Sequence, residues 1–242
     1  MYLTIDIGNT SAKTVIFSKD TIKKVSISKN LSVKELKTIF SSREISAAVL
    51  SSVAPVKKDV IHFLQSHTSF IHLNSGTKIP IRVRYKTPET LGSDRLASVI
   101  GAAKLFPGKN VLVIDAGTCI KYDFISSKKI YTGGSISPGL KMRFLALHNF
   151  TARLPLIEPG KTRDFIGTST KGSIVTGVQQ GIINEIDGFI SLYKKRFGSL
   201  KVVITGGDSS LFAGHIKSSI FAAPNLIHIG LHEILKSNVE QS

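Results

Sequence analysis

Leu3-Thr-Ile-Asp6-Ile-Gly8-Asn-Thr10, near the start of the chain, is matched further on by Leu112-Val-Ile-Asp115-Ala-Gly117-Thr118. Each copy is an apolar strand that ends in an aspartate, followed by one residue, a glycine and soon a threonine. Each then runs on into a second strand, through Lys13 in the first copy and Lys121 in the second. Because an internal repeat is typical of a duplicated architecture, the match predicts two related domains, residues 1–108 and 109–242.

Short β-branched runs alternate with helix-like stretches along most of the chain, which predicts an α/β fold. The runs Val111–Ile114 and Val202–Ile204 are continuously apolar, as expected of strands covered on both faces. A helix is predicted around Leu96, Val99, Ile100 and Ala103, with Ser93 as its N-cap and Pro107-Gly108 as its stop. The predicted strands are Leu3–Ile7, Lys13–Phe17, Ala47–Val53, Ile79–Tyr85, Val111–Ile114, Tyr122–Ile125 and Val202–Thr205.

The composition of the 242 residues is that of an ordinary globular protein, with 42% hydrophobic and 20% charged residues. There is no apolar run long enough to span a bilayer and no secretory signal pattern at Met1. One cysteine, Cys119, cannot form an internal disulfide, which is compatible with a reducing compartment. We therefore expect a cytoplasmic protein without a membrane partner. Cys119 has no paired base nearby in sequence, and the seven histidines show no zinc-ligand spacing.

The formal net charge of +16 raises the possibility of a nucleic-acid partner, because basic surfaces attract phosphates. The basic residues are scattered in singles and short groups, such as Lys23-Lys24 and Lys194-Lys195-Arg196, without a long basic tail. This pattern favours a solvated surface that attracts small anionic ligands, and we expect no nucleic-acid partner. A nucleotide- or nucleic-acid-binding regulator without turnover remains the alternative from another functional class.

The turn from Asp6 to Lys13 has the composition of a phosphate-binding turn. Its glycine lets backbone N–H groups approach a phosphate, and Lys13 can offset the charge of a transferring phosphoryl group. Asp6, an acceptor when ionised, suits a hydrated Mg²⁺ ion. An ordinary hairpin would use the same turn-forming residues, but the second copy at Asp115 favours phosphate binding.

Two further segments carry candidate function. Val202-Val-Ile-Thr205-Gly206-Gly207-Asp208 is a strand that runs into two glycines, which leave room for a flat base or a ribose. Tyr85-Lys-Thr-Pro88-Glu-Thr-Leu-Gly92-Ser93-Asp94-Arg95 lies immediately before the periodic helix. An aspartate there is stabilised by the helix dipole and can be a simple cap, whereas the adjacent Arg95 gains nothing from the dipole and favours function.

Taken in order, these motifs resemble type III pantothenate kinase, the committed-step enzyme of coenzyme A biosynthesis. The resemblance includes Gly133-Gly-Ser-Ile-Ser-Pro138-Gly139, Thr151-Ala-Arg-Leu-Pro155, and Thr170 with Gly177, so it covers nearly the whole chain. It implies an actin-like (ribonuclease H-like) fold with an ATP cleft between the two domains, and a homodimer with active sites near the interface. It also implies ATP-dependent phosphorylation of pantothenate. A sugar or acyl-acid kinase on the same fold would not carry the Gly-Ser-Asp-Arg stretch.

The resemblance also implies roles for individual residues. Asp94 would accept the proton of the pantothenate hydroxyl, and Asp115 would hold a monovalent cation, K⁺ or NH₄⁺. Thr170 would come from the neighbouring subunit. Pantothenate would be bound by Tyr85, Gly92, Ser93, Asp94, Arg95 and Thr170. ATP would be bound by Asp6, Ile7, Gly8, Asn9, Thr10, Ser11, Ala12, Lys13 and Thr118.

One position departs from the family pattern, because Lys121 stands where relatives usually have threonine. A lysine ammonium near Asp115 would occupy or repel the cation site. If Lys121 instead faces the other side of its strand, the cation site stays intact, since strand side chains alternate between faces.

Overall fold

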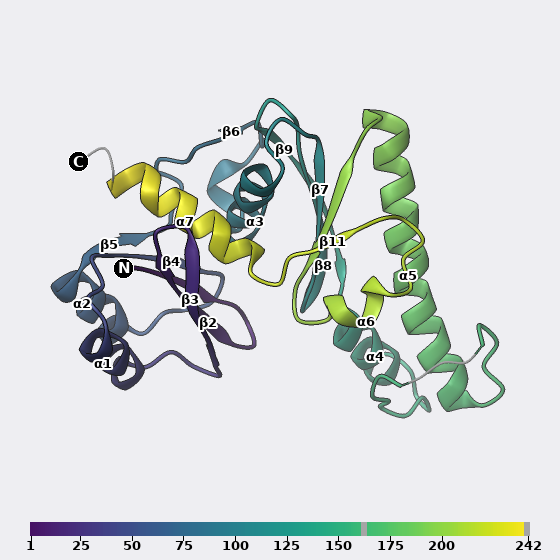
Figure 1. Cartoon of the computed structure of the whole chain (residues 1–242). Helices are drawn as coiled ribbons and strands as arrows, with labels where there is room; N and C mark the ends of the chain where they lie inside the picture. The colour runs from purple at the N-terminus through teal and green to yellow at the C-terminus, as the bar shows by residue number, and fades with distance from the viewer. Residues whose placement is uncertain (161–163, 240–242) are drawn as a thin grey trace. The chain divides into compact units, whose positions relative to one another are not determined.

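The computed structural model describes residues 1–160 and 164–239, which form two compact units (Figure 1). The first unit contains Met1–Gly108, Ile125–Thr132 and the described residues from Asn225 onward. The second unit contains Lys109–Phe124 and Gly133–Pro224. The chain therefore passes between the units more than once, and each unit is described separately below.

The first unit is built on a five-stranded sheet in the order β3-β2-β1-β4-β5. β1 pairs antiparallel with β2 and parallel with β4, and Asp6 in β1 lies directly opposite Lys13 in β2. Successive side chains of β4 point to opposite faces of the sheet, and both sets are buried. Ala48 and Leu50 join one buried cluster, and Ala47 and Val49 join another. The strands are β1 (Tyr2–Ile7), β2 (Ala12–Ser18), β3 (Thr21–Ser28), β4 (Ala47–Ser52) and β5 (Ser69–His72).

Helices cover both faces of this sheet. One face packs against α1 (Val33–Ser42) and α2 (Lys58–His67), and Ser32 and Glu35 form a capping box at the start of α1. The other face packs against α3 (Ser93–Leu105) and α7 (Leu226–Val239). α3 and α7 can approach closely because Gly101 has no side chain. A Cβ added there would collide with the backbone of Leu226. A short η1 turn (Pro88–Thr90) precedes α3.

The second unit carries most of a six-stranded sheet in the order β11-β10-β7-β8-β9-β6. Its central strand β7 is buried along its whole length, as expected from its continuous apolar run. β9 begins within the first unit, where Arg82-Val83 of β6 pair with Ile130-Tyr131. The strands are β6 (Arg82–Val83), β7 (Val111–Ala116), β8 (Cys119–Ile125), β9 (Ile130–Pro138), β10 (Lys201–Thr205) and β11 (Phe221–Ala222).

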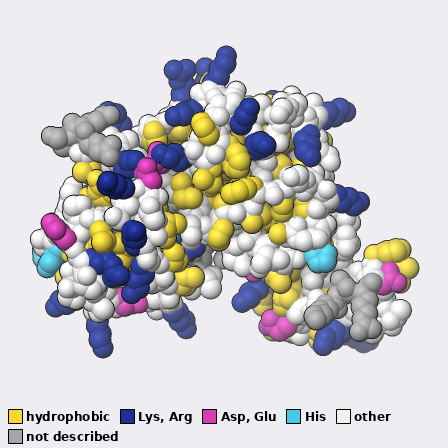
Figure 2. All heavy atoms as spheres, viewed as in Figure 1, with side chains coloured by type: hydrophobic (Ala, Val, Ile, Leu, Met, Phe, Trp, Pro, Cys, Tyr) yellow, Lys and Arg dark blue, Asp and Glu magenta, His cyan; other side chains and the backbone are white. Residues whose placement is uncertain are grey.

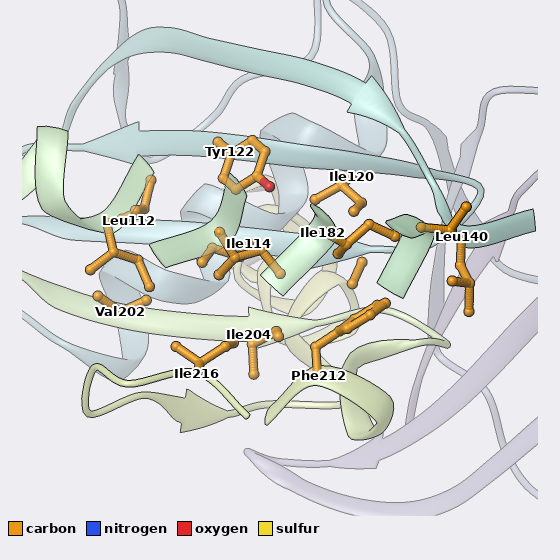
Figure 3. Close-up of a cluster of buried hydrophobic side chains, with 14 of the residues drawn as sticks. Leu112, Ile114, Ile120, Tyr122, Leu140, Ile182, Val202, Ile204, Phe212 and Ile216 are labelled. Carbon is orange, nitrogen blue, oxygen red and sulfur yellow. The ribbon is translucent and has the colours of Figure 1, made fainter. Parts of the chain in front are cut away.

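The core of the second unit lies between its sheet and its helices. Leu112, Ile114 and Tyr122 of the sheet pack against Ile182 of the long helix α5 and Phe212 of α6 (Figure 3). Ser169 caps α5 by accepting a hydrogen bond from the Gly172 N–H. The helices are α4 (Leu140–Asn149), α5 (Thr170–Phe197) and α6 (Ser209–Ala213).

The predicted duplication is visible in the sheets. In chain order, the first five strands give the spatial order third, second, first, fourth, fifth, and β7 to β11 repeat that order. In both sheets the first strand is parallel to the fourth, and the fourth is parallel to the fifth. The prediction of an α/β fold made of two related, actin-like halves is therefore confirmed.

Several local predictions need correction. The predicted strand Ile79–Tyr85 is reduced to the two residues of β6. Gly92, not Ser93, is the N-cap of α3, and no side chain caps that helix. Ser93 instead turns its hydroxyl toward Ser51 and Ser52. The sequence reading also missed β3, β5, β9 and β11.

Within residues 1–160 and 164–239, no helix is long and apolar enough to cross a membrane. The basic side chains are spread over the face seen in Figure 2, and few acidic side chains lie between them. This distribution matches the scattered basic residues of the sequence.

Candidate functional site

The first acidic turn joins β1 to β2 in the first unit. The Gly8 N–H donates to the Ser11 carbonyl at 3.0 Å, which closes the turn, and Asn9 and Thr10 are exposed at its tip. Lys13 follows on β2, opposite Asp6. Partial burial lowers the pKa of the Lys13 ammonium, and the Asp6 carboxylate counteracts part of that shift. The turn thus combines two exposed polar residues at its tip with a partly buried ammonium on the strand that follows, a composition suited to a polyphosphate.

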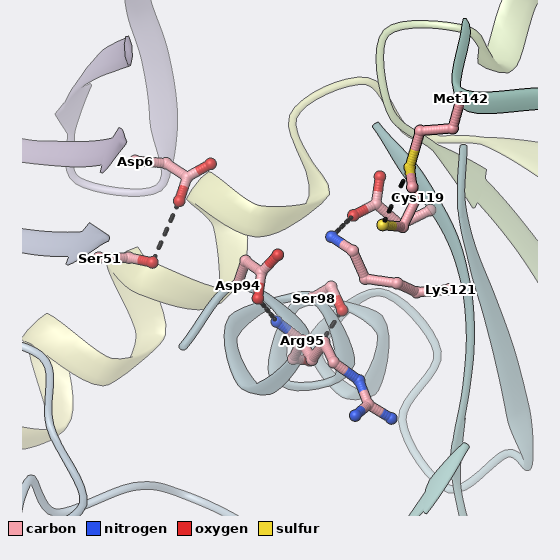
Figure 4. A network of polar contacts seen from close by, with 9 residues as sticks. Asp6, Ser51, Asp94, Arg95, Ser98, Cys119, Lys121 and Met142 are labelled. Carbon is pink, nitrogen blue, oxygen red and sulfur yellow. Dashed lines mark hydrogen bonds and ion pairs between the residues drawn. The ribbon is translucent and has the colours of Figure 1, made fainter. Parts of the chain in front are cut away.

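A chain of hydroxyls connects this turn to the start of α3. Ser51, at 0% exposure near the end of β4, donates to Asp6 Oδ1 at 3.1 Å (Figure 4). The same hydroxyl lies 2.9 Å from Ser93 Oγ, which also approaches the Ser52 carbonyl at 3.3 Å. The parallel pairing of β1 and β4 puts Asp6 and Ser51 at the same register. Ser51 therefore fixes the Asp6–Lys13 turn relative to the helix that carries Asp94.

Asp94 lies in the first turn of α3, where the helix dipole favours a carboxylate. Its Oδ1 accepts the Arg95 N–H at 2.8 Å, which orients the carboxyl group. A Cβ added at Gly92 would lie 2.6 Å from that same Oδ1. Glycine at position 92 is therefore what allows the Asp94 carboxylate to occupy this place.

Arg95 points in a different direction from Asp94 (Figure 4). Its guanidinium, in a side chain that is almost fully buried, lies 5.7 Å from the centre of the Tyr85 ring. Tyr85 in turn stacks on the buried Tyr131, with 6.2 Å between ring centres. These three side chains form a stack within the first unit, so Tyr85 and Arg95, predicted from one motif, do lie together.

The second acidic turn joins β7 to β8 in the second unit. Lys121 on β8 forms an ion pair with Asp115, with 2.7 Å between Nζ and Oδ2 (Figure 4). On the other side of Asp115, a Cβ added at Gly206 would lie 2.6 Å from Oδ1. Gly206 has a φ of 95°, which only glycine adopts readily. The Gly206-Gly207 turn is anchored there because the Asp208 N–H donates to the Ala116 carbonyl at 2.9 Å.

A charged network supports the other side of this turn. The Gly139 N–H donates to the Thr118 carbonyl at 3.1 Å. Just before Gly139, Ser137 Oγ contacts Glu185 Oε1 at 2.5 Å, and Arg143 Nη2 contacts Glu185 Oε2 at 2.6 Å. Burial raises the pKa of Glu185, but the hydrogen bonds from Ser137, Arg143 and Tyr122 outweigh it and hold that pKa below its usual range. Glu185 is therefore a fixed anion that ties α5 to the end of β9 and to α4. Gly139, which bonds to Thr118, lies between those two elements.

Not all predicted site residues fall in one unit. Residues 6–13, Tyr85 and Gly92–Arg95 belong to the first unit, whereas Asp115, Thr118 and Thr170 belong to the second. Thr118 and Thr170 are both exposed, the latter as the first residue of α5. The sequence analysis missed Ser51 and Glu185. The side-chain partners described above for both residues lie at least 42 residues away along the chain. A serine at the end of a predicted strand was the only available signal for Ser51.

The Asp6 and Asp115 carboxylates are the candidate metal ligands at the two turns. In the described part of the chain, no cluster of three or more His, Cys, Asp or Glu could hold a metal ion. The Asp6 carboxylate with its hydroxyl neighbour fits a metal held mainly by a nucleotide and water. Asp115 does not fit a monovalent cation, because a lysine ammonium already contacts its Oδ2.

Comparisons with known proteins agree with this geometry. The fold resembles that of a protein from Campylobacter jejuni described as a Baf family transcriptional activator, with a TM-score of 0.63 at 22% identity over 98% of this chain and 99% of that one. A ROK family glucokinase from Streptomyces griseus, solved with glucose and AMPPNP, gives a TM-score of 0.56 at 10% identity over 98% and 99%. These likenesses establish the fold.

Proteins found by sequence comparison share a higher identity with this chain than these solved structures do. A protein named type III pantothenate kinase from Christiangramia forsetii is 42% identical over 100% of both chains. One of the same name from Bacteroides fragilis is 42% identical over 98% of both. The family profile of type III pantothenate kinase matches residues 2–192. The chain therefore belongs to the type III pantothenate kinase family.

Proposed function

We propose that this protein transfers the γ-phosphoryl group of ATP to the primary hydroxyl of pantothenate, giving 4'-phosphopantothenate, in the first step of coenzyme A biosynthesis. Family membership supports the reaction. The observation that carries it to this chain's own residues is the Asp6–Ser51–Ser93 hydrogen-bond chain. It ties a phosphate-binding turn to the helix start that carries a carboxylate, within one compact unit.

In this proposal Asp94 accepts the proton of the pantothenate hydroxyl. Phosphoryl transfer asks a protein mainly for alignment and charge stabilisation. The Arg95 N–H holds the Asp94 carboxyl in one orientation, so its hydrogen bond to the hydroxyl would align that oxygen with the γ-phosphorus. The proton would move to Asp94 as the oxygen–phosphorus bond forms.

The remaining substrate contacts follow the family motif. Tyr85 and Arg95, which stack on one another, would contact pantothenate together with Gly92 and Ser93. We propose that Thr170 contributes from the partner subunit of a homodimer. Support for a homodimer comes from large apolar side chains exposed around α4 and the start of α5, among them Phe150 at 87% and Phe165 at 75%.

For ATP, residues 6–13 would bind the phosphates and Thr118 would add a contact from the second unit. We propose Mg²⁺ as the accompanying ion, with Asp6 holding one of its water ligands; bound with ATP, it neutralises charge on the phosphates. The half-buried Lys13 would stabilise negative charge as the phosphoryl group moves. We infer no K⁺ or NH₄⁺ ion at Asp115, because the Lys121 ammonium already contacts that carboxylate.

The test is ADP release measured by a coupled assay, with and without pantothenate. Release that depends on pantothenate, with a phosphomonoester product seen by ³¹P NMR, would support the function. ATP turnover that is indifferent to pantothenate, or that needs a sugar instead, would overturn it.

A further inference from the structure

The two acidic turns differ in the spacing between aspartate and lysine. In the first unit, Asp6 and Lys13 face each other across the β1–β2 ladder. In the second unit the spacing from Asp115 to Lys121 is one residue shorter. This shorter hairpin still brings the lysine to the aspartate, with 2.7 Å between Lys121 Nζ and Asp115 Oδ2.

The Asp115–Lys121 pair is shielded from water on both sides. The Lys121 side chain is 17% exposed and the Asp115 side chain 10%. The Gly206 turn lies against the other carboxylate oxygen, where even a methyl group at Cα would be 2.6 Å away. A buried carboxylate needs a counter-charge, since an unpaired one is strongly unfavourable. Here the counter-charge is the ammonium of Lys121, a side chain of the neighbouring strand β8.

A mobile cation cannot easily join this arrangement. An ion bound to Asp115 would lie within several ångströms of the Lys121 ammonium. At about 4 Å and an effective dielectric constant of about 20, the repulsion between two unit charges lowers affinity on the order of 10³-fold. That loss is enough to empty a weak site.

We propose that the Lys121 ammonium replaces a monovalent metal ion at Asp115, so that this turn carries its own counter-charge and the protein is indifferent to K⁺ and NH₄⁺. The expected indifference of the kinase reaction rests on the proposed function. The expected indifference of the folded protein does not, because it concerns only the ion pair in the second unit.

The experiment is thermal unfolding of the ligand-free full chain in KCl, NH₄Cl, NaCl and choline chloride at equal ionic strength. The wild-type melting temperature should be the same in all four salts. Lys121→Thr, which leaves Asp115 without its ammonium, should unfold earlier in choline and be restored selectively by K⁺ or NH₄⁺. Lys201→Thr is the matched control, because it removes one lysine from an exposed position of the same unit.

Selective stabilisation of the wild type by K⁺ or NH₄⁺ would overturn the proposal. So would a folded Lys121→Thr protein that is as indifferent to cations as the wild type. Should Lys121→Thr fail to fold in every salt, titration of the wild type with Tl⁺ followed by ²⁰⁵Tl NMR decides. Saturable Tl⁺ binding that K⁺ displaces and Asp115→Asn removes overturns the proposal, and absence of such binding supports it. A protein without pantothenate kinase activity would still give these readouts.

Discussion

Ser51 Oγ donates to Asp6 Oδ1 at 3.1 Å while lying 2.9 Å from Ser93 Oγ, so one buried hydroxyl joins the phosphate turn to the helix of the proposed base. We expect Ser51→Ala to lower the free energy of unfolding by about 1–2 kcal/mol, because two polar groups lose a buried partner. It should also lower kcat/KM for ATP by roughly tenfold, since Asp6 is less well held. Chemical denaturation and steady-state kinetics measure both, with Ser66→Ala, an exposed serine of α2, as the control. Unchanged kinetics would remove Ser51 from a positioning role.

Asp94→Asn should remove the proposed acceptor of the hydroxyl proton without disturbing the turn at residues 6–13. The expected loss in kcat is on the order of 10²-fold or more, the lower range for a positioned proton acceptor. ATP affinity measured by calorimetry should stay within about twofold. Glu89→Gln, an exposed carboxylate in the turn just before α3, is the matched control. A variant with normal kcat would show that Asp94 is not the base.

Gly92→Ala should disturb the reaction more than the fold. The added Cβ would lie 2.6 Å from Asp94 Oδ1, and the carboxylate can rotate away more cheaply than the backbone can move. We expect kcat to fall at least tenfold while the melting temperature changes by no more than about 2 °C. Gly188→Ala in α5, where a Cβ meets nothing within 4 Å, controls for the substitution itself. A large drop in melting temperature with normal kcat would contradict this expectation.

The proposed homodimer with shared sites predicts complementation. Thr170 and Asp94 would come from different subunits, so mixed dimers of Asp94→Asn and Thr170→Ala chains would contain one site with both native residues. Mixing the two inactive proteins should restore a fraction of wild-type activity, and analytical ultracentrifugation should show a dimer. A fully active monomer at nanomolar concentration would rule the arrangement out.

His228 predicts a pH dependence of stability that has no part in catalysis. Burial, reinforced by the nearby Lys13 ammonium, lowers the pKa of His228 to about 3. Because the unfolded chain binds a proton below about pH 6.5 and the folded chain does not, stability falls as pH drops from 6.5 toward 3. The His228 contribution should amount to roughly 2 kcal/mol lost between pH 6.5 and 5.

Denaturant unfolding at a series of pH values measures this effect. His228→Gln, which keeps a polar group near Thr4, should be less stable at pH 7 but should lose less stability on acidification than the wild type. His62→Gln, an exposed histidine of α2, should follow the wild-type curve. Parallel curves for wild type and His228→Gln would show that His228 does not titrate differently on unfolding.

The sequence predicted best those elements whose pattern is set by burial. The apolar runs of β7 and β10 reflect coverage on both faces, and the Asp6 and Asp115 turns repeat because each ends a strand with a buried centre. β3 escaped prediction because it is mostly exposed and carries Lys23-Lys24 in its middle. β9 escaped because Gly133-Gly134 interrupt it, and two consecutive glycines usually signal a turn.

The candidate site could also be predicted from the sequence only in part. Local motifs predicted which residues would gather at each turn, but Ser51 becomes part of the site only through the register of β1 against β4. Likewise the residue type at position 121 raised two alternatives, and only the rotation of β8 decides that its ammonium faces Asp115. Contacts between strands distant in sequence depend on pairing and twist, which no single motif encodes.

The return of the chain to the first unit at Asn225 has a consequence for how the protein is made. Leu231, Ile234 and Leu235 of α7 complete a buried cluster with Ala47 and Val49 of β4. A ribosome synthesises β4 and α3 long before α7, so the part of the first sheet that α7 covers must wait while the whole second unit is translated. At about 5–20 residues per second, this interval lasts on the order of ten seconds or more. Nascent chains would therefore expose an apolar face for that time, which makes this stretch of synthesis the natural point for a chaperone to engage.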